Sequence, residues 1–111
     1  MDVATFAQQL LRALNARDSR AVHLRVKARG KTAILGVDEG DTWVPLLRLS
    51  NPSAAVNVMN LDVRQGSGWA PTFERGGPDQ LVEHLAGPLA FTWAIEVDEV
   101  LAWRDTSGQG H

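Results

Sequence analysis

The hydrophobic pattern of this chain changes its period once within the first fifty residues. The apolar side chains near the start recur at intervals of three and four residues, as on one face of an α-helix: Val3, Phe6, Ala7, Leu10, Leu11 and Leu14. From residue 21 onward, apolar and polar residues alternate, which is typical of a strand with one buried face. A helix with a single apolar stripe needs a flat partner. The pattern therefore predicts a helix lying on a β-sheet.

Glycine-containing turns divide the alternating region into strands. Gly30 and Gly40 each lie in a polar segment, and glycine tolerates the positive φ that tight turns need. We therefore expect strands from residue 21 to the first turn, over 32–37 and over 42–50, joined as antiparallel hairpins. Pro45 has no N–H to donate, so it should mark a sheet edge, a bulge or a break.

The second half of the chain gives a less uniform pattern. Residues 54–63 suit either a strand or a short helix, and the strand is favoured. Residues 65–77 are rich in glycine and are expected to form a loop, and a short helix should begin at Pro78 and end before Gly87. Large and small residues then alternate over 89–97, which predicts a strand.

The large side of that last strand should be core, with Phe91, Trp93 and Ile95 packing opposite side chains of the two helices, namely Leu10, Leu14 and Leu85. Its small side, Ala90, Thr92 and Ala94, would let another layer or subunit approach closely.

Length and composition set the fold class. A chain of 111 residues with 44% hydrophobic and 22% charged residues has the size and composition of one globular domain. We predict an α+β fold of two layers, an antiparallel meander of about four to five strands covered on one face by the N-terminal helix and the second short helix. Residues 1–104 would form this domain and residues 105–111 a flexible tail.

The residue types that carry catalysis are sparse. There is no cysteine, and the histidines His23, His84 and His111 are too scattered for a metal site. Carboxylates cluster at Asp38–Asp41, where a turn accounts for them. We therefore expect no cofactor and no metal, and a protein that is not an enzyme. The enzymatic alternative would place a site near Trp69, with Glu74, Arg75 and a histidine.

Basic residues are concentrated in one segment. Residues 17–31 carry six basic side chains and one acidic one, a charge of +5, whereas the remaining residues carry −7. Four of the basic residues are candidate binding residues: Arg25, Lys27, Arg29 and Lys31. Such a stripe suits phosphates, so nucleic-acid binding through this hairpin is one alternative. Against it, the segment holds no aromatic residue on which a base could stack.

Tryptophan is the other excess, with four in the chain. Trp69 and Trp103 are the two least committed to the predicted core, and exposed indoles make strong binding contacts. We therefore expect a non-enzymatic interaction domain, with these two residues in its binding surface, that forms a homodimer and that could bind another protein.

Short apolar runs argue against a membrane span, and an acid at position 2 argues against a secretory signal. We therefore expect a cytoplasmic protein. Arginine outnumbers lysine nine to two, a bias typical of a bacterial gene of high GC content.

Overall fold

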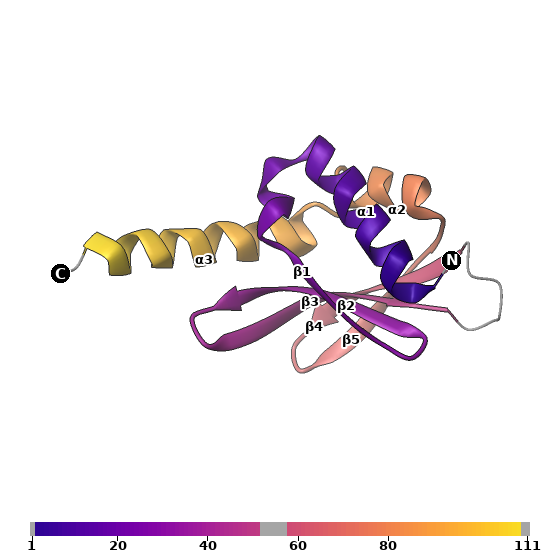
Figure 1. Cartoon of the computed structure of the whole chain (residues 1–111), viewed down its shortest axis with the longest axis horizontal. Coiled ribbons are helices and arrows are strands. Elements are labelled where there is room, and N and C mark those ends of the chain that lie inside the picture. Colours follow the sequence, from indigo (N-terminus) through magenta and orange to yellow (C-terminus); the bar gives the residue numbers. More distant parts are fainter. Residues whose placement is uncertain (1, 52–57, 110–111) are drawn as a thin grey trace.

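The computed structural model describes residues 2–51 and 58–109, and its centre is a five-stranded antiparallel sheet with helices on one face (Figure 1). The strands follow one another across the sheet in chain order. This confirms the α+β class with an N-terminal helix and a later short helix. The elements are α1 (Val3–Arg17), η1 (Ser19–His23), β1 (Arg25–Arg29), β2 (Thr32–Glu39), β3 (Thr42–Ser50), β4 (Met59–Gln65), β5 (Gly68–Gly76), α2 (Pro78–Leu85) and α3 (Phe91–Gln109).

Helix α1 forms as its apolar spacing predicts. The Asp2 carboxylate caps the helix by accepting the Thr5 backbone N–H at 2.7 Å. The buried residues of α1 are the predicted stripe without Leu11, which is half-buried: Val3, Phe6, Ala7, Leu10 and Leu14. At its far end Arg17 donates to Glu83 of α2 at 2.7 Å, so the two helices lie together over the sheet (Figure 1).

The first two hairpins also follow the sequence. Gly30 and Gly40 have φ of +60° and +63° in the two predicted turns, and β3 has its predicted bounds. The pairing of β2 with β3 shifts at Gly36, whose partner is Pro45, so the proline lies at a bulge as expected. The start of β1 was predicted too early. Asp18 caps the 3₁₀ turn η1 by accepting the Arg20 N–H, and Val22 in that turn is 64% exposed.

The region after β3 corrects one prediction. Residues 59–63 are strand, as favoured, and residues 54–57 lie outside the described residues. The expected glycine-rich loop over 65–77 is wrong, because most of it is β5. A turn with Gly66 at φ +60° folds this segment back onto β4 as a fifth strand.

The predicted strand over 89–97 is wrong, because this segment begins helix α3. The residues of α3 that reach the core are spaced three and four apart: Trp93, Ala94, Val97 and Val100. Trp93 is fully buried as expected, and its indole N–H donates to the Leu85 carbonyl at 2.9 Å. Phe91 and Ile95, expected beside it, are 64% and 54% exposed, since a helix turns them away from Trp93. The small residues 90, 92 and 94 therefore do not form one face, because Thr92 is turned away from Ala90 and Ala94.

Helix α3 begins against the body and then projects from it (Figure 1). It continues to Gln109, through most of the segment expected to be a tail, and residues 110 and 111 lie outside the described residues. Within the described part of the chain, no helix combines the length and the apolar composition that crossing a membrane requires.

Candidate functional site

The sheet has one face toward the helices and one face away from them. Residues paired across neighbouring strands share a face. One such row runs Lys27, Ile34, Arg48, Asp62 and Pro71 from β1 to β5. The alternate row of Leu35, Leu47 and Val63 points to the helices, and both leucines are fully buried. We call the side with the Lys27 row the open sheet face; α1 and α2 lie on the other side (Figure 1).

The open sheet face is strongly basic. The strand pairing places six cations and two carboxylates on it: Arg25, Lys27, Arg29, Arg48, Arg64 and Arg75, with Asp38 and Asp62. Its formal charge is therefore +4, although the whole chain carries −2. The rest of the chain carries −6, so the excess of positive charge is concentrated on the open sheet face.

The Trp43 ring packs against Gly36 on this face. A Cβ at Gly36 would come within 2.8 Å of the indole, so the ring packs directly on the glycine backbone of β2. The Lys27 ammonium lies 4.2 Å from the ring centroid, a cation–π contact that spans β1 to β3. Because Gly36 has no side chain, there is room for an aromatic ring beside the cations of β1.

Trp69, one of the predicted binding residues, has a similar setting. The guanidinium groups of Arg48 and Arg64 lie 5.3 Å and 5.4 Å from its ring centroid. Arg48 is held by Asp62 at 2.8 Å, and Arg64 donates to the Gly66 carbonyl at 3.0 Å. Trp69 is thus a half-buried ring among positioned cations.

The predicted basic residues divide into paired and unpaired groups. Arg25 forms an ion pair with Asp38 of β2. Among the described residues Lys27, Arg29 and Lys31 have no ion-pair partner, and all three are exposed. Arg25, Lys27 and Arg29 share the open sheet face with Trp69, whereas Lys31 lies in the β1–β2 turn.

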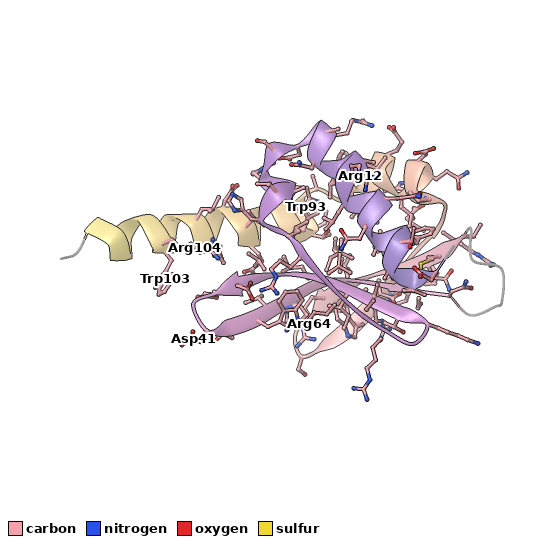
Figure 2. All side chains as sticks on the ribbon, viewed as in Figure 1. Arg12, Asp41, Arg64, Trp93, Trp103 and Arg104 are labelled. Atoms are coloured by element: carbon pink, nitrogen blue, oxygen red, sulfur yellow. The ribbon has the colours of Figure 1, made fainter. Side chains whose placement is uncertain are left out.

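Trp103, the last predicted binding residue, lies elsewhere. It belongs to α3 and extends toward the β2–β3 hairpin, whose tip carries Asp41 (Figure 2). Its ring lies 3.6 Å from the position of a Cβ on Gly40, and Arg104 beside it donates to the Asp38 carbonyl at 2.5 Å. Trp103 therefore helps hold the projecting helix against the hairpin, and it remains half-exposed.

Exposed apolar side chains form a second surface, on α3 and β5, which we call the α3–β5 surface. A hollow of about 480 Å³ lies between these elements. Its apolar lining is Val63, Pro71, Leu89, Phe91 and Ile95. Pro71 also borders a smaller hollow beside Phe73, whose side chain is 90% exposed.

The backbone of Phe73 is strained. Its φ is +63°, which is unfavourable for a bulky side chain. Three β5 residues, 72–74, lie opposite Leu61 of β4 at a bulge. The Thr72 hydroxyl bridges this bulge, donating to the Leu61 carbonyl at 2.7 Å and accepting the Glu74 N–H at 3.1 Å. The bulge projects an aromatic ring into solvent.

The residues proposed for an enzymatic site are separated by the sheet. Glu74 pairs with His84 of α2 at 2.8 Å on the helix side, while Trp69 and Arg75 lie on the open face. Among the described residues no three His, Asp or Glu side chains are arranged to hold a metal ion.

One carboxylate with a lowered pKa, Asp18, helps to hold the fold together. Hydrogen bonds from the Arg20 guanidinium hold the pKa of Asp18 below its ordinary value, and Asp98 of α3 binds the same guanidinium at 2.8 Å. This network joins η1 to α3.

Sequence reasoning missed four members of the open sheet face: Trp43, Arg48, Arg64 and Arg75. A strand over 42–50 was predicted, but the sequence did not show the register that sets Trp43 beside Lys27. Pairing of β1, β2 and β3 brings Trp43 to Lys27, which supplies the aromatic ring that the basic segment lacks.

Comparisons of this chain with protein-family models, with curated proteins and with solved structures find no match.

Proposed function

We propose that this chain is a non-enzymatic interaction domain that associates with a second copy of itself through the α3–β5 surface. One observation carries the proposal: Phe73, Phe91 and Ile95 are more than half exposed around neighbouring hollows. Large exposed apolar side chains grouped in this way are typical of interaction sites.

The charges at the rim favour a second copy as the partner. Arg64 and Glu96 both line the larger hollow, so the rim carries one charge of each sign. In a twofold interface every contact occurs twice: if one residue of the first copy contacts a second residue of its partner, the same pair also meets with the copies exchanged. Arg64 of each copy can then face Glu96 of its partner, and the projecting Phe73 supplies a ring for an apolar hollow. A surface of this kind complements itself.

The test is the mass of the chain in solution. We expect sedimentation equilibrium at micromolar concentration to give about twice 12.1 kDa. Ile95→Glu places a charge among apolar groups and should return the single-chain mass with an unchanged circular dichroism spectrum. Val22→Glu changes an equally exposed apolar residue on η1 and should leave the dimer intact. A single-chain mass for the unchanged protein would refute the proposal.

A further inference from the structure

The open sheet face brings the cations of β1 and β5 onto one surface with the aromatic rings of β3 and β5. We propose that this face binds single-stranded nucleic acid. The cations of β1 and β5 would hold phosphates, and bases would stack on the rings and guanidinium planes at Trp43 and Trp69.

Charge is the first support. Arg29 and Arg75 stand at opposite ends of one row across the sheet, through Thr32, Ser50 and Asn60. Four strand spacings separate them, about 19 Å. Cations therefore border both edges of a face with charge +4, while the rest of the chain carries −6. This separation attracts a polyanion to the open face and repels it from the helix side.

The availability of the cations is the second support. Lys27, Arg29 and Arg75 have no ion-pair partner within the described ranges. A phosphate can approach them without displacing a carboxylate. Arg48 is paired to Asp62 and instead stays beside the Trp69 ring.

The flat groups decide the kind of polyanion. Indoles and guanidinium planes both provide surfaces on which bases stack. A duplex hides the faces of its bases within its own stack, whereas a single strand presents them. An acidic peptide would use the cations and leave the two tryptophans without a role. A single strand uses both kinds of group.

Binding is measured by fluorescence anisotropy with labelled single strands of about 12 nucleotides, one oligothymidylate DNA and one oligouridylate RNA. Contacts with three or four phosphates predict that the affinity falls about 10- to 20-fold between about 50 and 150 mM salt. Tryptophan fluorescence should decrease as the strand binds. Binding of either strand supports the proposal, and the ratio of the two affinities shows what the 2′-hydroxyl contributes.

Matched variants locate the site. Arg29→Ala and Arg75→Ala should each weaken binding and make the salt dependence shallower, by about 0.7 in the log–log slope. Arg12→Ala removes the same charge from the exposed side of α1 and should have little effect (Figure 2). Trp69→Ala should weaken binding about 5- to 150-fold, and Trp69→Phe, which keeps a ring, should weaken it less. Trp103→Ala, on α3, should not.

Several results would overturn the proposal. One is the absence of a complex with either strand at the lower salt. Another is an equal effect of Arg12→Ala and Arg29→Ala, and a third is an unchanged affinity in a folded Trp69→Ala variant. Equal binding of a duplex of the same length or of polyglutamate would also do so, because neither presents bases to the rings.

Discussion

The two faces of the sheet are built from the same strands and differ in every other respect. The face toward the helices is mainly apolar, and its leucines are fully or almost fully buried: Leu35, Leu47, Leu49 and Leu61. The open face places Trp43 and Trp69 against cations, in contact with solvent. Because successive side chains of a strand point to opposite faces, one residue step separates the core from the candidate binding surface.

Side chains on the two faces also differ in how much they contribute to the free energy of folding. Truncating a large side chain in a packed core costs about 2–5 kcal/mol. An exposed cation–π contact contributes about 0.5–1 kcal/mol, and a surface ion pair about 0–1 kcal/mol. Substitutions on the covered face should therefore act on folding, whereas side-chain truncations on the open face should act on binding.

The largest expected effect tests the covered face. Trp93→Ala should lower the free energy of unfolding by about 3–5 kcal/mol, because it leaves a cavity and removes the donor to the Leu85 carbonyl. Phe91→Ala, two residues away, should cost less than about 1 kcal/mol, since its ring is mostly exposed. Urea titration of both variants measures the difference. Equal losses would mean that α3 does not separate the two rings.

A smaller effect is expected at Gly36, which lies on the open face but is buried, so a substitution there should act on folding. Gly36→Ala should cost about 1–3 kcal/mol, because the added Cβ would lie 2.3 Å from the Val44 carbonyl oxygen and 2.8 Å from the Trp43 ring. The cost should persist in a Trp43→Ala background, since the carbonyl remains. Gly68→Ala, whose nearest contact is 3.9 Å, is the matched control and should be nearly neutral. The unfolding midpoints of the unchanged protein, the three single variants and the double variant decide this.

The smallest effect concerns the ionic link between η1 and α3. The folded-state pKa of Asp18 is lowered, first by the hydrogen bonds from Arg20, so its carboxylate stabilises the fold above its unfolded pKa of about 3.9. That stability is lost as the pH falls through the lower folded pKa. Asp18→Asn should therefore cost about 1 kcal/mol at neutral pH, and the cost should shrink as the pH falls below the unfolded pKa and through the folded one. Urea unfolding at several pH values tests this, and a cost independent of pH would contradict it.

The N-terminal half could be predicted because its pattern has a single solution. Residues 3–14 match only the helical period, and the ends of β3 are marked by the turn at Gly40 and by the polar residues that follow Leu49. The segment 89–97 could not be assigned in this way, because apolar or small residues occupy nearly every position. Its alternation of large and small residues suits a strand, while Trp93, Ala94, Val97 and Val100 equally fit one helical stripe.

The prediction of a loop for the glycine-rich segment was wrong for a different reason. Composition indicates a loop over 65–77, but Val63, Arg64 and Gln65 of β4 are paired with residues of β5. That pairing satisfies the backbone of a segment with weak strand propensity. The bulge at Phe73 has no sequence signal, because only the register between β4 and β5 creates it.

By itself, the sequence determined the local elements with strong periods, their turns, the absence of cysteine chemistry and the presence of a basic segment. Only the tertiary structure decided that α3 is a helix, that Phe91 and Ile95 face outward, and that Trp43 and Trp69 share a face with the cations of β1. The physical reason is that period and turn chemistry act between near neighbours in the chain. Strand register and helix packing instead bring together residues tens of positions apart, such as Arg48 and Trp69 or Arg20 and Asp98.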